Sequence, residues 1–310
     1  MSADASPTRA LILGCAGPRL GEEEAAFFRR ADPLGFILFR RNCENPDQLT
    51  TLVRDLRASV GRPGAPVMID QEGGRVQRLR PPHWPAHPPA AHFADRPEAE
   101  VRANAASIGR MVAAHGISVV AAPVLDLRFE GASDVVGDRS LGRDSEIVAR
   151  LGRAWIEGFR DVGVTPVIKH LPGHGRARVD SHLALPVVDA PLEELEREDF
   201  GPFRRLADAG AWGLTAHIVF TAIDPDRPAT LSPTVIGDII RGRIGFDGIL
   251  LSDDLSMGAL KGSMGERVAG ALAAGCDIAL HCNGKMAEMI EAAEAATPLS
   301  EETRRRMGQG

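Results

Sequence analysis

Residues 164–175 read Val-Thr-Pro-Val-Ile-Lys-His-Leu-Pro-Gly-His-Gly, an apolar run followed by a polar one. The apolar run, residues 164–168, is typical of a buried strand. The polar run contains too much Gly and Pro for a helix, and Asp180, Ser181 and His182 follow it closely. We therefore expect titratable side chains to leave the C-terminal end of a strand on a loop, where residues more often perform chemistry than stabilise a core.

Similar apolar runs recur along the chain, separated by amphipathic stretches of helical length. The predicted strands are Ala10–Gly14, Gly35–Phe39, Pro66–Asp70, Ile117–Ala122, Val164–Lys169, Trp212–His217, Gly248–Ser252 and Asp277–His281. The predicted helices include Asp47–Val60, Glu98–His115, Ser145–Val162, Pro191–Ala209 and Pro233–Gly242. This alternation is typical of right-handed βαβ units and a parallel sheet.

Eight predicted strands in a chain of 310 residues indicate an α/β fold, a single closed (β/α)8 barrel of the TIM type. The alternative is an open, doubly wound sheet, but no G-x-G-x-x-G follows the first strand. No long linker, repeat or low-complexity tract divides the chain, so we expect one domain, residues 1–310, without a second domain. We interpret Arg80–Pro89 as a long loop after the third strand, and the charged residues after Pro298 as a last helical turn or a frayed end.

The composition is ordinary for a soluble globular protein, with 44% hydrophobic and 25% charged residues. The net charge of −6 argues against nucleic acid, which binds a basic face, and against an anionic membrane. The N-terminal residues lack a signal-peptide pattern, and no run of about 20 apolar residues occurs. We therefore expect a cytoplasmic protein with four reduced cysteines and no evident obligate protein partner, with one or two disulfides as the alternative.

Polar side chains follow nearly every predicted strand. They are residues 70–75 after the third strand, Asp126, Asp138 and Arg139 after the fourth, Lys169 and His170 after the fifth, His217 after the sixth, residues 252–254 after the seventh and residues 281–283 after the eighth. In a barrel these positions meet at the C-terminal face of the strands, where barrel enzymes carry their active sites. The sequence therefore predicts a polar site at that face.

Asp253 and Asp254 directly follow the apolar run of residues 248–252. A carboxylate that is fixed by a rigid strand and partly screened from water suits a nucleophile. The alternative is a helix N-cap, because an Asp before residues 255–257 can accept hydrogen bonds from free amides. Both interpretations hold together if Asp254 caps and Asp253 reacts.

Asp180 and His182 have the spacing of a proton-transferring histidine and the carboxylate that orients it. A histidine held in this way transfers protons near neutral pH. The alternatives are two unrelated polar loop residues, or a metal site built from His170 and His174. The Pro and Gly residues between those two histidines prevent the helix that would stack them, so the zinc signal is weak.

Five residues at the same face have the character of a clamp for sugar hydroxyls: Asp70, Arg78, Arg139, Lys169 and His170. Hydroxyls need donors and acceptors in fixed pairs, and charged partners bind them more strongly. The alternative is a set of internal salt bridges that brace the rim of the barrel. Gly73 and Gly74 either let the backbone approach a ligand closely or shape a turn.

Four motifs occur in order along the chain: Asp-Gln-Glu-Gly-Gly-Arg-Val-Gln-Arg at residues 70–78, Lys-His-Leu-Pro-Gly-His-Gly at 169–175, Asp-Ser-His at 180–182 and Ser-Asp-Asp-Leu-Ser-Met at 252–257. They resemble the motifs of glycoside hydrolase family 3, from near residue 10 to near residue 290. The similarity is greatest to the bacterial cytoplasmic β-N-acetylglucosaminidase branch that acts in peptidoglycan recycling.

This resemblance implies a single barrel domain and a retaining exo-β-N-acetylglucosaminidase of the β-N-acetylhexosaminidase class. The implied substrate is a small carbohydrate, N-acetylglucosaminyl-anhydro-muropeptide, and no cofactor or metal is implied. Asp253 matches the family nucleophile, which forms a covalent glycosyl-enzyme, and His182 matches the general acid/base with Asp180 as its partner. The sugar-holding positions are Asp70, Arg78, Arg139, Lys169 and His170. One departure is the loop at residues 176–179, Arg-Ala-Arg-Val, which is more basic than in the family.

Three other functions remain alternatives. A β-glucosidase or β-xylosidase of the same family would need a different acetamido pocket and often takes its acid/base from a second domain. A glycoside phosphorylase would use the same neutral histidine, because it tolerates attack by phosphate better than a carboxylate does. A non-catalytic sugar-binding barrel is the third, but pure binding needs neither Asp253 nor His182.

Overall fold

Eight parallel strands close into a barrel in the order β1-β12-β11-β9-β7-β6-β3-β2. The computed structural model describes residues 7–179 and 185–308. The barrel strands are β1 (Arg9–Gly14), β2 (Pro33–Leu38), β3 (Val67–Ile69), β6 (Val119–Val120), β7 (Thr165–Leu171), β9 (Trp212–Thr215), β11 (Leu250–Asp254) and β12 (Ile278–His281). Each corresponds to one predicted strand, which confirms the (β/α)8 barrel.

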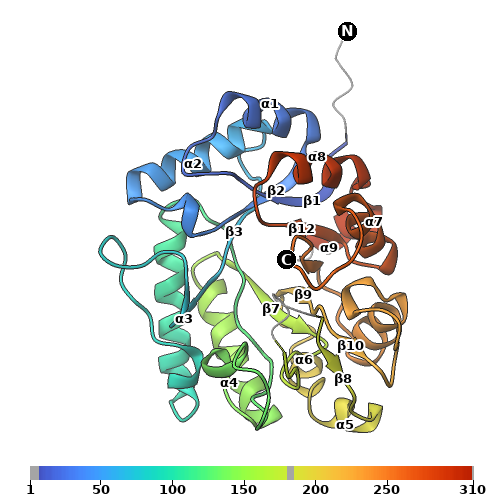
Figure 1. Cartoon of the computed structure of the whole chain (residues 1–310). Helices are drawn as coiled ribbons and strands as arrows, with labels where there is room; N and C mark the ends of the chain where they lie inside the picture. The colour runs from blue at the N-terminus through green and yellow to red at the C-terminus, as the bar shows by residue number, and fades with distance from the viewer. Residues whose placement is uncertain (1–6, 180–184, 309–310) are drawn as a thin grey trace.

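Helices surround the barrel and cover its outer surface (Figure 1). The α-helices are α1 (Glu22–Ala31), α2 (Pro46–Ser59), α3 (Glu98–Ala113), α4 (Ser145–Arg160), α5 (Leu192–Arg197), α6 (Gly201–Arg205), α7 (Met264–Ala274), α8 (Met286–Ala295) and α9 (Glu301–Met307). Short 3₁₀ turns are η1 (Arg40–Asn42), η2 (Ala90–Phe93), η3 (Gly137–Arg139) and η4 (Ala229–Leu231), and η5 (Val235–Arg243) is a π-helix. Two small sheets lie outside the barrel: β4 (Gln71–Gly73) pairs with β5 (Val76–Gln77), and β8 (Val187–Val188) pairs with β10 (Val219–Phe220).

Four of the helices, α2, α4, α7 and α9, begin at a side-chain N-cap. Asp144 accepts hydrogen bonds from the free backbone N–H groups at the start of α4, and Asn45 does the same for α2. Ser263 and Glu266 form a reciprocal capping box at the start of α7. Each cap accepts hydrogen bonds from backbone N–H groups that have no partner within the helix, so the helix begins at a defined residue.

Two predicted helices differ in the structure. The segment predicted as one helix, Pro191–Ala209, divides into α5 and α6. Pro202 lies in the first turn of α6, where its missing N–H costs nothing, but its ring prevents the helix from continuing through from α5. The segment predicted as Pro233–Gly242 is the π-helix η5. The charged C-terminal segment, interpreted as a helical turn or a frayed end, forms α9.

Two apolar clusters make the core. One fills the inside of the barrel with side chains of the strands, such as Ile12, Met68, Val167 and Leu251. The other lies between the strands and the helices and contains most of the large aromatic residues. Because side chains fill the barrel interior, a ligand site can lie only at its mouth.

The helix α9 is held to the barrel by buried polar contacts. Thr303 Oγ1 donates to Asp277 Oδ1 at 3.0 Å, and Arg306 Nη1 donates to the same oxygen at 2.8 Å. Arg241 Nη2 donates to the other oxygen of Asp277 at 2.7 Å. These bonds fix the C-terminal segment against the start of β12.

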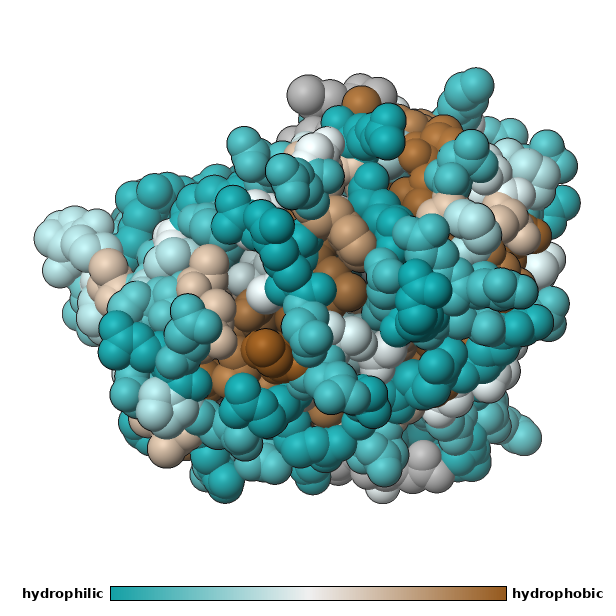
Figure 2. All heavy atoms as spheres, turned by 90° about the horizontal axis from the view of Figure 1, so that it is seen from below, coloured by the Kyte–Doolittle hydropathy of each residue, from teal (hydrophilic) through white to brown (hydrophobic). Residues whose placement is uncertain are grey.

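The surface seen in Figure 2 is mostly hydrophilic, with hydrophobic atoms gathered in a few hollows. Of the helices in residues 7–179 and 185–308, each is too short or too polar to cross a lipid bilayer. The four cysteines are buried and unpaired, as expected for reduced thiols.

Candidate active site

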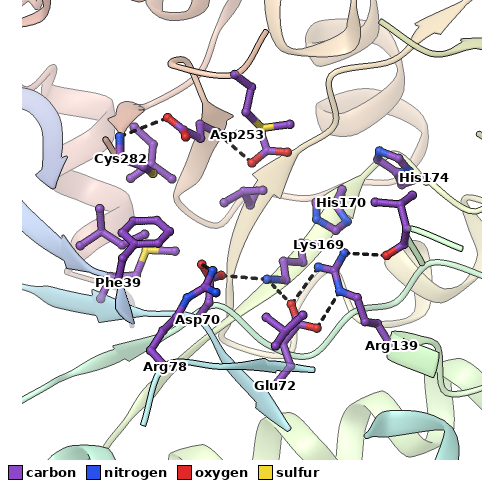
Figure 3. A pocket seen from close by; sticks show the side chains of 18 of the residues that line it. Phe39, Asp70, Glu72, Arg78, Arg139, Lys169, His170, His174, Asp253 and Cys282 are labelled. Carbon is purple, nitrogen blue, oxygen red and sulfur yellow. Dashed lines mark hydrogen bonds and ion pairs between the residues drawn. The ribbon is translucent and has the colours of Figure 1, made fainter. Parts of the chain in front are cut away.

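A pocket of about 250 Å³ opens where the barrel strands end. Six of the predicted site residues line it together: Asp70, Arg78, Arg139, Lys169, His170 and Asp253. Figure 3 shows Asp253 on one side of the pocket and the group of Asp70, Lys169 and Arg139 on the other. Segments far apart in the sequence, from β3 to β11, therefore contribute to one site.

Lys169 joins two carboxylates at the floor of the pocket. Its Nζ lies 3.1 Å from Asp70 Oδ1 and 2.6 Å from Glu72 Oε1, and its side chain is only 4% exposed. Lys169 lies on β7, and the two carboxylates follow β3. One cation therefore bridges two segments of the barrel mouth.

Two arginines complete this network. Arg139 forms a two-pronged ion pair with Glu72, with both N–O distances at 2.8 Å, and Arg78 Nη2 donates to Asp70 Oδ2 at 2.9 Å. The guanidinium group of Arg78 also lies 5.0 Å from the centre of the Phe39 ring. The structure shows the salt bridges that brace the rim, and the residues that form them also line the pocket. A clamp for sugar hydroxyls stays a prediction for these residues.

The network controls the ionisation of its carboxylates. Burial opposes the charged form of Glu72, but Arg139 and Lys169 outweigh it and lower the pKa of Glu72 to about 2. Burial opposes the charged form of Asp70 as well, and Lys169 and Arg78 hold the pKa of Asp70 well below its usual range. Both side chains are therefore anions at neutral pH, and Glu72 is occupied by two cations rather than available as a nucleophile.

Asp126 is fully buried and holds the two histidines of the 169–175 motif. Its Oδ2 accepts a hydrogen bond from His170 Nδ1 at 2.7 Å, and its Oδ1 accepts from the backbone N–H groups of His170 and His174 at 3.2 and 2.7 Å. Burial opposes ionisation of Asp126, but His170 outweighs it and lowers the pKa of Asp126 to about 2. Because Nδ1 of His170 donates to this carboxylate, Nε2 is the ring nitrogen available to a ligand.

His174 is the second histidine of the motif, and its ring centre lies 5.3 Å from that of His170. Burial and the neighbouring His170 lower the pKa of His174 to about 4, against the opposing effect of Asp126. The side chain is therefore neutral at pH 7. The two histidines share a wall of the pocket, and the His170 ring is bonded to the Asp126 carboxylate.

Asp253 lies at the end of β11 with its carboxylate in the pocket. Its Oδ1 accepts a hydrogen bond from the backbone N–H of Asp254 at 2.8 Å, and Oδ2 has no hydrogen-bond partner within the described part of the chain. Burial opposes the charged form, but His217, His170 and Lys169 favour it, and the pKa of Asp253 lies below its ordinary value. The side chain is therefore an anion that lines the pocket.

Asp254 does not cap a helix, contrary to the alternative drawn from the sequence. Its Oδ1 accepts from the backbone N–H groups of Ser256 at 2.9 Å and Cys282 at 3.1 Å. The residues that follow form turns, and the next helix, α7, begins only after Ser263. The carboxylate therefore ties the end of β11 to the end of β12, a contact between neighbouring strands that local sequence cannot reveal.

Asp180 and His182, the predicted orienting carboxylate and acid/base, lie outside the described residues. The segment just before them is anchored by Arg176, whose guanidinium contacts Glu194 at 2.6 Å, Glu198 at 2.5 Å and Asp199 at 2.7 Å. The same group lies 4.1 Å from the centre of the Phe129 ring. The basic character of this loop thus serves internal ion pairs at Arg176, whereas Arg178 is exposed.

Gly73 and Gly74 shape a turn. Both have positive φ angles, 99° and 56°, at the turn between β4 and β5. A Cβ on Gly73 would lie 2.2 Å from the carbonyl oxygen of Pro88. The two glycines therefore let the hairpin pack against the Pro-rich loop 80–89.

The sequence analysis assigns no role to two residues of the site, Glu72 and Asp126. Glu72 is included only in the polar run of residues 70–75, although its position two residues after Asp70 is a signal that both carboxylates face the same side. Asp126 was noted as a strand-end residue, and no sequence pattern links it to His170. Within residues 7–179 and 185–308, three or more metal-ligating side chains do not cluster anywhere.

Residues 18–307 match the family model described as the glycosyl hydrolase family 3 N-terminal domain. A β-hexosaminidase of Alkalilimnicola ehrlichii is 42% identical over 282 residues, which cover 88% of this chain and 80% of that protein. The crystal structure of NagZ from Neisseria gonorrhoeae in complex with N-trifluoroacetyl-D-glucosamine superposes with a TM-score of 0.89 at 34% identity, covering 98% of this chain and 90% of that one. A family 3 β-N-acetylglucosaminidase from Paenibacillus sp. str. FPU-7 gives a TM-score of 0.89 at 33% identity over 97% of this chain, which spans 60% of that protein.

Proposed function

The chain belongs to glycosyl hydrolase family 3, and we propose that it is a retaining exo-β-N-acetylglucosaminidase. It removes a terminal β-linked N-acetylglucosamine from a larger carbohydrate through a covalent bond to Asp253. The names of its relatives support this substrate, because they include β-hexosaminidases and a β-N-acetylglucosaminidase. A neighbour of the same fold was crystallised with an N-acylated glucosamine.

The observation that carries the proposal is the placement of Asp253. Its carboxylate lies across the pocket from the Asp70–Lys169–Arg139 group, so a sugar held by that group would present its anomeric carbon to a carboxylate. The strand holds the carboxylate, and the hydrogen bond from Asp254 N–H leaves one oxygen for attack. A pocket of about 250 Å³ favours one terminal sugar ring over an internal segment of a polymer.

The reaction proceeds by two displacements at the anomeric carbon. In the first, Asp253 Oδ2 forms a bond to the carbon while the glycosidic C–O bond breaks, and the leaving oxygen takes a proton from the protonated His182, which becomes a neutral imidazole. In the second, the neutral His182 removes a proton from water and is protonated again, the water oxygen bonds to the carbon, and the bond to Asp253 breaks. The two inversions restore the β configuration in the released sugar.

His182 and Asp180 take their roles from the family motif, residues 180–182, because they lie outside the described residues. A histidine in this role is positively charged or neutral beside the anionic Asp253, which avoids the repulsion that a second carboxylate would create there. Asp180 would orient that imidazole and stabilise its charged form after proton uptake. Asp70, Arg78, Arg139, Lys169 and His170 would hold the sugar hydroxyls through charge-assisted hydrogen bonds.

The natural substrate that we propose is an N-acetylglucosaminyl-anhydro-muropeptide released during turnover of the peptidoglycan cell wall, and the cytoplasm is the proposed site of action. This part of the proposal rests on the resemblance of the four motifs to the peptidoglycan-recycling branch. The net charge of −6 favours a small uncharged or weakly charged sugar unit over nucleic acid.

Four nitrophenyl substrates test the activity: the β-N-acetylglucosaminide, the β-glucoside, the β-xyloside and the α-N-acetylglucosaminide. We expect rapid release of nitrophenol from the first alone, and NMR spectra should show the β anomer as the first product. Preference for the glucoside would refute the branch assignment, and first release of the α anomer would refute double displacement. The same assay with added phosphate would reveal phosphorolysis as a sugar phosphate product.

The nucleophile is tested with Asp253→Asn and, as a matched control, Asp226→Asn on an exposed loop. D253N should lower kcat by a factor of about 10⁴ or more because the nucleophile is lost, while its melting temperature stays close to that of the parent. D226N should retain full activity. Release of N-acetylglucosamine from a purified muropeptide by the parent enzyme, and not by D253N, would test the natural substrate.

A further inference from the structure

Three buried side chains connect the backbone N–H of Asp253 with the backbone carbonyl of Asp254. The backbone N–H of Asp253 donates to Thr215 Oγ1 at 3.1 Å, and the Thr215 and Thr230 hydroxyls lie 2.8 Å apart. Thr230 Oγ1 lies 2.8 Å from His217 Nδ1, and His217 Nε2 lies 3.0 Å from the carbonyl oxygen of Asp254. All three side chains are 0% exposed. The hydrogen bonds therefore form a ring that starts and ends on neighbouring residues of β11.

The direction of each hydrogen bond follows from the one group that can only accept. The Asp254 carbonyl accepts, so His217 Nε2 carries a hydrogen, and in the neutral imidazole Nδ1 is then an acceptor. The Thr230 hydroxyl donates to Nδ1, the Thr215 hydroxyl donates to Thr230, and Thr215 accepts from Asp253 N–H. Each of the four bonds then has one donor and one acceptor, and all of the bonds run in one direction.

The Thr230 hydroxyl also lies 3.0 Å from a second acceptor, the carbonyl oxygen of Ala216. This contact ties η4 to the segment that follows β9.

We propose that Thr215, Thr230 and His217 act as positioning residues that hold the backbone of Asp253 and Asp254, and so fix the direction of the Asp253 carboxylate toward the anomeric carbon. This inference rests on the proposed role of Asp253 as the nucleophile. It requires no contact between the three residues and the sugar, and none of the three lines the pocket.

The electrostatics of the site agree with this placement. Burial opposes the charged form of Asp253, and the neighbouring His217, His170 and Lys169 favour it, so that the pKa of Asp253 stays below its ordinary value. The contact from β9 and η4 reaches the nucleophile through its backbone. The sugar-binding cations come from other segments, so the two functions are separable.

Thr230→Val tests the proposal because it removes the hydroxyl and keeps the shape. We expect kcat for nitrophenyl β-N-acetylglucosaminide to fall by a factor of about 10–100, as for a small misplacement of a reacting group, while the inhibition constant of free N-acetylglucosamine changes by less than about twofold. Thr230→Ser restores the hydroxyl and should recover kcat to within about threefold. Thr215→Val should repeat the loss, so the test survives if one valine variant does not fold.

Thr221→Val is the matched control, because the Thr221 hydroxyl bonds to Asp189 and Val188 on the sheet outside the barrel. Its kinetics should equal those of the parent. Folded T230V and T215V with kcat within twofold of the parent would overturn the proposal, as would a loss of N-acetylglucosamine binding equal to the loss of kcat. If D253N is inactive while T230V is normal, only this inference fails. If D253N is active, the nucleophile assignment fails and this inference fails with it.

Discussion

Glu72→Gln removes one negative charge from the centre of the pocket network and keeps the size of the side chain. Glu72 is 4% exposed and pairs with Lys169 and with both prongs of Arg139. The network lowers the pKa of Glu72 from 4.5 to about 2, a difference that corresponds to about 3 kcal/mol of stability at neutral pH. Breaking one partner of a buried ion pair costs about 3–5 kcal/mol, which agrees with that figure.

Thermal unfolding at pH 7 measures this loss. For a chain of this size, each kcal/mol lost from the free energy of unfolding lowers the melting temperature by about 2–3 °C, so E72Q should melt about 6–10 °C below the parent. The charge of Glu72 stabilises the folded state above pH 4.5 and its contribution is lost as the pH falls toward 2. The difference in melting temperature between the parent and E72Q should therefore become smaller as the pH falls from 4.5 toward 2, because Gln does not titrate.

Glu302→Gln is the matched control, since Glu302 is half exposed and pairs with Arg305 at the surface. Its melting temperature should change by no more than about 2 °C. If E72Q and E302Q lose the same small amount, the buried network does not stabilise the fold. A gap between parent and E72Q that stays constant from pH 7 to pH 3 would show that charge is not the cause of the loss.

Arg176→Gln should lower kcat/KM by about tenfold, because the segment leading to His182 loses its anchor, whereas Arg178→Gln should have the kcat/KM of the parent. Equal kcat/KM values for the two variants in steady-state assays would contradict this role of Arg176. Asp126→Asn should weaken competitive inhibition by N-acetylglucosamine by about 10–100-fold, since His170 loses a charge-assisted partner, and unchanged inhibition would exclude that role. Thr303→Val should lower the melting temperature by about 2–4 °C through the loss of one buried hydrogen bond, with kcat unchanged. A change in kcat there would connect α9 to the site.

The barrel is predictable from sequence because each buried parallel strand requires a continuous apolar run, and such runs are visible without any tertiary information. The run of residues 248–252 illustrates both the strength and the limit of this signal. It correctly predicts a strand, but β11 continues to Asp254. Hydrogen bonds from the neighbouring β9 and β12 segments extend it, and those partners lie about 30 residues or more away in sequence.

The candidate site divides in the same way. Residues at strand ends, such as Asp70 and Lys169, are predictable because the barrel topology brings all strand ends to one face. Ion pairs and hydrogen bonds across the barrel are not predictable from the sequence, because they depend on which side chains meet after the barrel closes. The pairing of Asp126 with His170 joins positions 44 residues apart, and Glu72 with Arg139 joins positions 67 apart. The prediction of one continuous helix over Pro191–Ala209 is wrong for a local reason, because the ring of Pro202 interrupts it.

The first strand of the barrel lies between β2 and the last strand, β12. A nascent chain emerging from the ribosome therefore carries β1 and β11 as unpaired edges until β12 has been translated. Since β11 carries Asp253 and pairs with β12, the candidate site is complete only after β12 has been translated. During that interval the open edges are the part of the polypeptide most prone to pair with another chain, and chaperone protection matters most there.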